Sequence, residues 1–272
     1  MSKTVESLDE LHRIEVELLH EIGRVCAEHG ISWFLHAGTL LGALRHKGPI
    51  PWDDDADIGM LPEDYEKFRA VAPQALGERF AFVDPADYDT FFDFVPRVSD
   101  RAHVYEASFL AADRFEGRLD HPDVDIFVFE PALGGIADAW QSLRLTVNYA
   151  EALGHRPVID HGQFTGVGKL ASYVLPAWGR RKSMKQHIAA RDALAKLGDP
   201  ASEWTRIVNE QPLNWDKRYR RAWLAPGRTL EFGGERFPVP QGAEQVVEAL
   251  YGPDWRQLPP VEKRHPTHSY LE

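Results

Sequence analysis

The sequence predicts an α+β fold, with strands and helices mixed in the first half of the chain and a helix-rich second half. Apolar residues recur at three- and four-residue spacing over about residues 4–28, which predicts an amphipathic helix that Gly30 ends. A nearly continuous apolar run over residues 124–129 predicts a buried strand of a sheet. Beyond Pro131 longer helical patterns replace the short runs, and we expect this helical half to pack on the sheet.

The other predicted elements follow the positions of glycine and proline. Residues 31–36 have a strand-forming composition, and the turn at Gly38 and Thr39 opens a short helix over residues 40–46. Two prolines, Pro49 and Pro51, hold the chain extended before a strand over residues 58–60. In chain order, the remaining elements are a helix over about residues 62–71, short strands within residues 79–109, helices over residues 137–153 and 180–197, strands over residues 229–232 and 236–239, and a helix over residues 243–250.

Composition limits the classes of function. The 272 residues suffice for a large core, and no stretch rich in Gly, Ser or Pro marks a domain boundary. The formal net charge of -11 argues against a large sequence-independent nucleic-acid-binding surface, which needs many Lys and Arg contacts to phosphates. The single cysteine, Cys26, excludes a disulfide within the chain. No apolar run reaches the roughly 18 residues that cross a bilayer, and the first residues lack a signal-peptide core. We therefore expect a soluble cytoplasmic protein without a transmembrane segment.

Aspartates crowd the segment from residue 53 to residue 57. If this segment is a strand, Asp53, Asp55 and Asp57 point to one face and Asp54 to the other, because side chains alternate along a strand. Carboxylates on one face repel each other, and a divalent cation relieves that repulsion. Oxygen ligands of this kind suit Mg²⁺ or Mn²⁺, which keep coordination positions for water and substrate phosphates. The segment therefore predicts a metal site for phosphoryl transfer.

Asp125 lies inside the apolar run, where an aspartate is costly to bury without a cation or hydrogen bonds. We expect a neighbouring strand to bring it to the same metal. Two alternatives stay open: Asp125 pairs with a structural arginine, and the acidic segment is a solvated turn. A calcium-binding EF-hand loop fits less well, because Ile58 stands where that loop needs glycine and Asp64 stands where it needs glutamate.

Residues before the acidic segment predict a site for an anionic substrate. Gly38 and Thr39 stand at a helix start, where backbone amides attract anions, although such a pair is also common as a plain helix cap. Arg45 supplies positive charge with the geometry for bidentate phosphate contacts. His36 is a candidate polar contact. Lys169 follows a glycine and is a weaker candidate for a donor phosphate, because the Walker spacing is missing.

Several stretches together resemble the signature of the LicD family, which includes bacterial phosphocholine transferases and is similar to fukutin and fukutin-related protein. The longest is HAGTLLGALRHKGPIPWDDDADIGM, residues 36–60. The sequence DIF at residues 125–127 resembles the family's later acidic strand. YGPDW at residues 251–255 and LPPVEKR at residues 258–264 resemble its closing motif. Residues 132–214 match no family that we recognise, and we expect them to carry acceptor specificity.

The resemblance implies a nucleotidyltransferase-type mixed β-sheet flanked by helices, in a single LicD-like domain of residues 1–272. Residues 1–131 would form the catalytic core, and residues 132–272 the mostly helical part with the closing motif. The resemblance also implies Asp55 and Asp57 as the catalytic metal pair, with Asp125 as a further catalytic residue. Either Asp125 or Asp53 would take the proton of the acceptor.

The implied reaction moves a phospho-alcohol, such as phosphocholine or a polyol phosphate, from a CDP-activated donor to a hydroxyl of a glycan or glycolipid acceptor. CMP leaves. Two other hypotheses stay open. One is a metal-dependent glycosyltransferase that uses nucleotide sugars, and the other is a catalytically silent module that binds a metal or a ligand.

Overall fold

The structure is a computed structural model that describes residues 2–91, 93–105, 121–156, 159–163, 165–210 and 212–266. Its helices are α1 (Leu8–His29), α2 (Ala37–Arg45), α3 (Pro62–Ala75), α4 (Gly135–Ala152), α5 (Gly166–Gly179), α6 (Met184–Ala195) and α7 (Ala243–Tyr251). Its strands are β1 (Lys3–Thr4), β2 (Phe34–Leu35), β3 (Ala56–Met60), β4 (Phe80–Val83), β5 (Arg97–Asp100), β6 (His103–Val104), β7 (Asp123–Pro131), β8 (Trp204–Ile207), β9 (Tyr219–Arg220), β10 (Arg228–Phe232) and β11 (Glu235–Val239).

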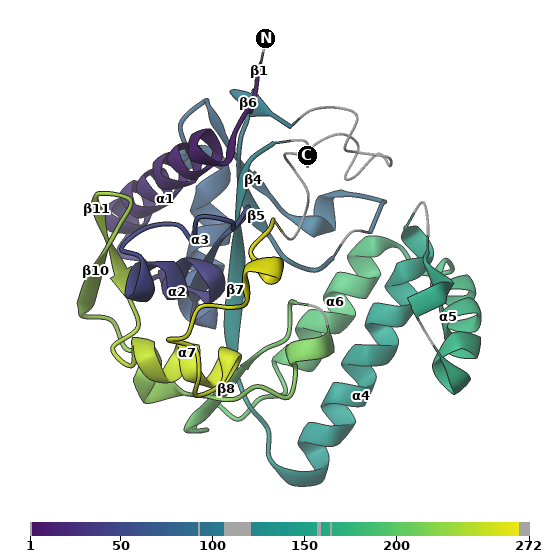
Figure 1. The fold of residues 1–272 in the computed structure, drawn as a ribbon. Helices are drawn as coiled ribbons and strands as arrows, with labels where there is room; N and C mark the ends of the chain where they lie inside the picture. The colour runs from purple at the N-terminus through teal and green to yellow at the C-terminus, as the bar shows by residue number, and fades with distance from the viewer. Residues whose placement is uncertain are drawn as a thin grey trace.

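A mixed sheet with the strand order β2-β3-β7-β5-β4 runs through the molecule (Figure 1). Strands β3 and β7 are parallel, and their register places Asp57 opposite Asp125. The other neighbours along this path are antiparallel. Strand β7 also pairs with β8 near its end, and β8 pairs with β9, so the second half of the chain extends the sheet. The predicted mixed sheet flanked by helices is confirmed.

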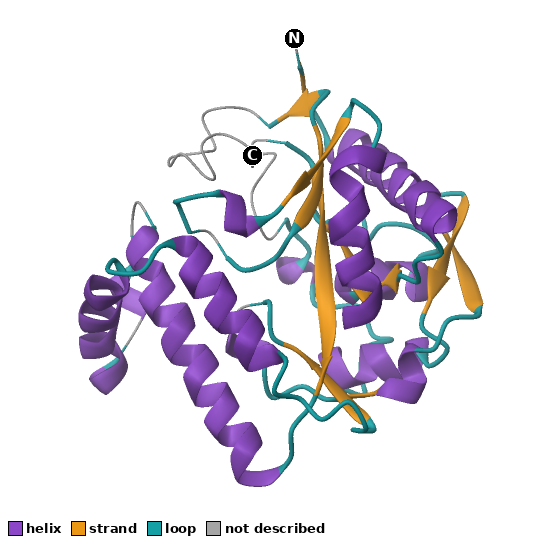
Figure 2. Ribbon diagram, turned by 180° about the vertical axis from the view of Figure 1, so that it is seen from behind, coloured by secondary structure: helices purple, strands orange, loops and turns teal. Residues whose placement is uncertain are grey.

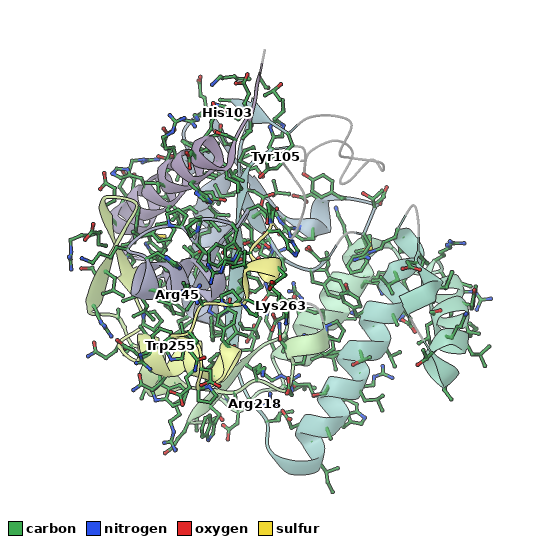
Figure 3. The ribbon with its side chains drawn as sticks, viewed as in Figure 1. Arg45, His103, Tyr105, Arg218, Trp255 and Lys263 are labelled. Carbon is green, nitrogen blue, oxygen red and sulfur yellow. The ribbon has the colours of Figure 1, made fainter. Side chains whose placement is uncertain are left out.

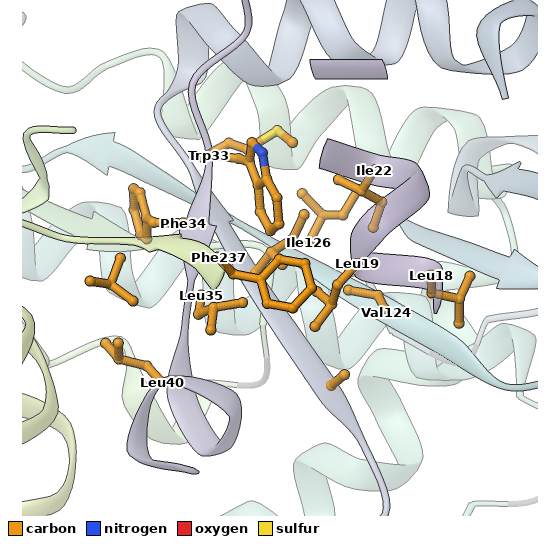
Figure 4. Close-up of a cluster of buried hydrophobic side chains, with 14 of the residues drawn as sticks. Leu18, Leu19, Ile22, Trp33, Phe34, Leu35, Leu40, Val124, Ile126 and Phe237 are labelled. Atoms are coloured by element: carbon orange, nitrogen blue, oxygen red, sulfur yellow. The ribbon is translucent and has the colours of Figure 1, made fainter. Parts of the chain in front are cut away.

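Helix α1 packs its apolar face against the sheet. It begins after Ser7, whose side chain caps the first turn, and ends at Gly30, which has the left-handed φ of 63° that glycine adopts without strain. Figure 4 shows the apolar residues of α1 facing those of β7, namely Leu18, Leu19, Ile22, Val124 and Ile126. This packing holds the strand that carries Asp125.

Helices α4, α5 and α6 form a layer on the other side of the sheet from α1 and α3 (Figure 2). Helices α4 and α6 contribute to a second apolar cluster, whose members include Phe91, Phe94, Leu145, Tyr149, Met184 and Ile188. Among the helices in the described part of the chain, none combines the length and the apolar character that crossing a bilayer requires. The division at residue 131 stays a prediction.

Several elements differ from the prediction. No pattern predicts α5, because Gly166, Gly168 and Pro176 are poor helix formers. The helix predicted over residues 180–197 begins only at Met184, after a capping box on Ser183. The strand predicted over residues 31–36 is reduced to β2. Strands β4, β5 and β6 occupy the region predicted to hold short strands, whose last residues, 106–109, lie outside the described residues.

Candidate functional site

A cavity of about 820 Å³ lies between the start of α2, the loop before β3, strands β5 and β7, and the segment after α7. Its wall brings together parts of the chain that are far apart in the sequence. The predicted site residues on this wall are His36, Gly38, Arg45, Asp53, Asp55, Asp57 and Asp125. Two predicted site residues, Thr39 and Lys169, do not line it.

The aspartates at residues 53–55 form a carboxylate cluster in the loop that precedes β3. One carboxylate oxygen from each of Asp53, Asp54 and Asp55 lies within 4.8 Å of the other two. The prediction that Asp54 points away from its neighbours is wrong, because β3 begins only at Ala56 and the alternation of a strand does not apply to a loop. The donor set of this cluster suits a hard divalent cation.

The first turn of α2 holds Asp57 in place. The backbone N–H of Asp57 donates to Oγ1 of Thr39 at 2.7 Å, and its carboxylate accepts a hydrogen bond from the backbone N–H of Gly38. Ala37 has a φ of 38°, a costly conformation for a residue with a side chain. Thr39 is buried and does not line the cavity, so its hydroxyl supports the strand of Asp57. The helix start therefore positions a carboxylate of the site.

Gly38 also makes room for Asp53. A Cβ atom at Gly38 would lie only 2.5 Å from Oδ2 of Asp53. On the other side of the loop, Nε2 of His12 is 2.8 Å from the backbone carbonyl oxygen of Asp53. The acidic loop is thus fixed between α1 and α2.

Asp125 lies next to a buried arginine. Nε of Arg97 in β5 is 2.5 Å from Oδ1 of Asp125. The same guanidinium is 2.7 Å from Oδ2 of Asp93 and 3.7 Å from Oδ2 of Asp123. Burial opposes the charge of Arg97, but these three carboxylates outweigh it and raise the pKa of Arg97 well above its ordinary value. The contact with a structural arginine, one of the open alternatives for Asp125, is therefore present.

Asp57 lies opposite Asp125 on the neighbouring strand β3. Burial, and then the charges of Asp55, Asp125 and Asp53, raise the pKa of Asp57 well above its ordinary value, although the Gly38 amide opposes the shift. Removing a proton from Asp57 therefore becomes easier when a cation is bound nearby.

Glu15 of α1 adds a carboxyl group that the sequence analysis missed. It is 1% exposed, and its Oε1 atom has no hydrogen-bond partner among the described residues. Burial, and then the aspartates at residues 53–55, raise its pKa well above its ordinary value. The available signal was an acidic residue on the apolar face of a predicted amphipathic helix, between Ile14 and Leu18.

The C-terminal motif closes one side of the cavity. Nη1 of Arg45 donates to the backbone carbonyl oxygens of Trp255 and Gln257, both at 3.3 Å, and Figure 3 shows Arg45 and Trp255 close together. Tyr251 also lines the cavity. The two ends of the family-like signature therefore meet at one site.

Glu210 is a second acidic group that the sequence analysis missed. It lines the cavity, and burial raises its pKa to about 7. Its Oε2 accepts a hydrogen bond from Nδ2 of Asn214 at 3.1 Å, whereas its Oε1 has no hydrogen-bond partner in the described part of the chain. Glu210 belongs to the segment without a recognised motif, so no sequence signal marked it.

His36 and Lys169, the remaining two residues predicted to contact the substrate, have surroundings different from those expected. His36 lines the cavity and packs its ring against Phe127 and Phe129, and burial lowers its pKa to about 3, so its ring is neutral. Lys169 is exposed in the first turn of α5, which lies at the outer edge of the helical layer in Figure 1. The structure therefore separates Lys169 from the cavity.

Comparison with known proteins tests the resemblance to the LicD family. Residues 30–155 match the family model described as the LicD/FKTN/FKRP nucleotidyltransferase domain. Over 270 residues, 96% of each chain, the sequence is 25% identical to lipopolysaccharide cholinephosphotransferase LicD of Haemophilus influenzae. Over 126 residues it is 32% identical to ribitol 5-phosphate transferase FKRP of Homo sapiens, a match that covers 45% of this chain and 22% of FKRP. The resemblance to the LicD family is confirmed.

Proposed function

We propose, from the LicD-type nucleotidyltransferase domain that this chain carries over residues 30–155, that the protein is a divalent-metal-dependent phosphotransferase. It moves a phospho-alcohol from a CDP-activated donor to a hydroxyl of a glycan or glycolipid. The observation that carries the proposal is the gathering of Asp53, Asp54, Asp55 and Asp57 in one cavity beside the start of α2. The similarities to a cholinephosphotransferase and to a ribitol 5-phosphate transferase support a phospho-alcohol as the transferred group.

The carboxylates of Asp53, Asp55 and Asp57 would hold Mg²⁺ or Mn²⁺, with Asp54 as a further ligand. These ions prefer oxygen ligands and leave coordination positions for phosphate oxygens. The raised pKa of Asp57 supports this assignment, because buried carboxylates that repel each other gain from a cation. When bound, the ion neutralises negative charge that develops on the diphosphate of the donor. The sequence also predicted Asp125 as a metal ligand. That role competes with its contact with Arg97.

Two further residues of the cavity have roles in the proposed transfer. Arg45 lines the wall beside the acidic loop and is suited to contact the phosphates of the donor. Glu210 accepts the proton of the acceptor hydroxyl as that oxygen attacks the donor phosphorus. The new phosphorus–oxygen bond forms while the bond to CMP breaks, and CMP leaves with the electron pair. Glu210 takes the place of the earlier candidates for the base, because Asp125 contacts Arg97 and Asp53 belongs to the metal cluster.

Isothermal titration of the purified protein with Mg²⁺ and a panel of donors tests the proposal. We expect saturable binding of CDP-choline or a CDP-polyol, and weaker binding of nucleotide sugars. The Asp55→Asn, Asp57→Asn double variant should lose this binding while it keeps the circular dichroism spectrum of the parent. A double variant that binds donor and metal as well as the parent would remove the assigned site. A preference for nucleotide sugars would favour a glycosyltransferase.

A further inference from the structure

Helix α5 presents an apolar face to the solvent. Val167, Leu170, Val174 and Trp178 are 86%, 67%, 56% and 57% exposed, respectively. Their spacing of three, four and four residues places them on one side of the helix. Exposed apolar patches of this kind are rare on monomeric proteins and mark interaction surfaces.

The exposure of this face does not come from loose packing of α5. The opposite face is buried, and a Cβ atom at Gly179 would lie only 2.0 Å from the backbone oxygen of Glu151 in α4. Nε of Arg180 donates to the backbone oxygen of Gly154 at 2.8 Å. The helix is therefore docked closely at its C-terminal end, while its apolar face points outward.

The charge of the segment that contains this helix is opposite in sign to the net charge of the whole chain, although Lys182 pairs with Glu151 and Arg191 pairs with Asp192. Residues 161–191 contain six Lys or Arg and no Asp or Glu, in a chain with a net charge of -11. Arg181 and Lys185 are exposed in the turn and helix start that follow α5. The guanidinium of Arg181 lies 4.1 Å from the ring centroid of Trp178, so positive charge borders the apolar face directly.

We propose that α5 and the turn after it, residues 165–185, form a docking surface for an anionic lipid bilayer. The helix lies in the plane of the membrane, with the four apolar residues at the boundary between headgroups and acyl chains and the basic residues beside the anionic headgroups. A second copy of the chain fits the same surface less well, because a symmetric contact would place two basic patches against each other. This proposal goes beyond the transferase activity and does not depend on it.

Sedimentation of the full-length protein with lipid vesicles tests the proposal. We expect binding to vesicles of phosphatidylcholine mixed with phosphatidylglycerol, little binding to pure phosphatidylcholine, and a decrease as salt is added. The Leu170→Ser, Trp178→Ser double variant should lower the partition coefficient at least about tenfold, because apolar area buried in the interface is lost. Arg181→Gln should lower it about fivefold, the effect of one basic residue near an anionic surface.

Two matched controls keep the test specific. Leu197→Ser removes an exposed leucine after α6, and Arg13→Gln removes an exposed arginine of α1, so both should bind vesicles like the parent. Exposed substitutions of this kind leave the thermal unfolding midpoint nearly unchanged. Vesicle binding that the double variant keeps would overturn the proposal. A different outcome is that the parent does not bind vesicles and forms a dimer in sedimentation velocity, while the double variant is a monomer. That outcome would also overturn the proposal and would identify the surface as a contact between two copies of the chain.

Discussion

Replacing Gly38 by alanine tests whether the acidic loop is a metal site. The added methyl group would lie 2.5 Å from Oδ2 of Asp53, whereas ordinary contacts are 3.4–4 Å long. The atom in the way is the end of a side chain and not backbone, so the carboxylate of Asp53 can withdraw by about 1 Å while the fold is kept. Metal–ligand distances in proteins lie within about 0.2 Å of their ordinary values, so a carboxylate displaced by about 1 Å no longer fits as a ligand. We therefore expect metal affinity to fall roughly 10- to 100-fold.

The unfolding free energy of the Gly38→Ala variant should rise or stay unchanged, although its metal affinity falls. Gly38 lies in the first turn of α2 with a φ outside the left-handed region, and alanine favours a helix by up to about 1 kcal/mol relative to glycine. Titration calorimetry with Mn²⁺ or Mg²⁺ measures the affinity, and thermal unfolding in the presence of EDTA measures the stability. The pair of measurements separates loss of the site from loss of the fold.

Gly42→Ala in the same helix is the matched control. Its methyl group would lie 2.5 Å from the backbone oxygen of Gly48, which cannot move away as a side chain can. We expect this variant to lose about 1–3 kcal/mol of unfolding free energy. If Gly38→Ala stays folded and binds the metal as tightly as the parent, Asp53 is not part of the metal site and the assignment of the loop is wrong.

Three further predictions concern other groups of the cavity. Asp125→Asn should lower the unfolding free energy by about 2–3 kcal/mol, because Arg97 loses a buried partner. It should reduce metal affinity less than Asp55→Asn does. A loss of affinity in calorimetry larger than that of Asp55→Asn would identify Asp125 as a ligand. The raised pKa values of Glu15 and Asp57 stabilise the metal-free protein at pH values below their ordinary pKa values, and this stabilisation is lost as the pH rises through the raised pKa values. Mg²⁺ should therefore increase the melting temperature more at about pH 8 than at about pH 5. An equal increase at both pH values would contradict this coupling. Glu210→Gln should lower kcat at least about 100-fold with little change in the donor KM, and should remove the acid limb of the pH–rate profile near the pKa of about 7; a variant that keeps this limb would exclude Glu210 as the base.

The sequence by itself determined the features that depend on neighbouring residues. The spacing of apolar residues predicted α1, and the short apolar run around Asp125 predicted β7. The signal at Gly38 and Thr39 predicted the helix α2, although the helix begins at Ala37 and both residues lie in its first turn. The register of β3 and β7 places Asp125 opposite Asp57, and the expectation that both hold the same metal stays a prediction. The resemblance to the LicD family rested on contiguous residues and is likewise confirmed.

Only the tertiary structure decided which distant residues complete the cavity. Arg97 reaches Asp125 because β5 lies beside β7, and Glu15 reaches the acidic loop because α1 packs against the sheet. Glu210 comes from a segment without a recognisable pattern. Asp54 was assigned to the wrong side because the strand begins two residues after it. Periodicity shows which residues share one face of one element, but the choice of partner for that face depends on the free energy of burying all segments together.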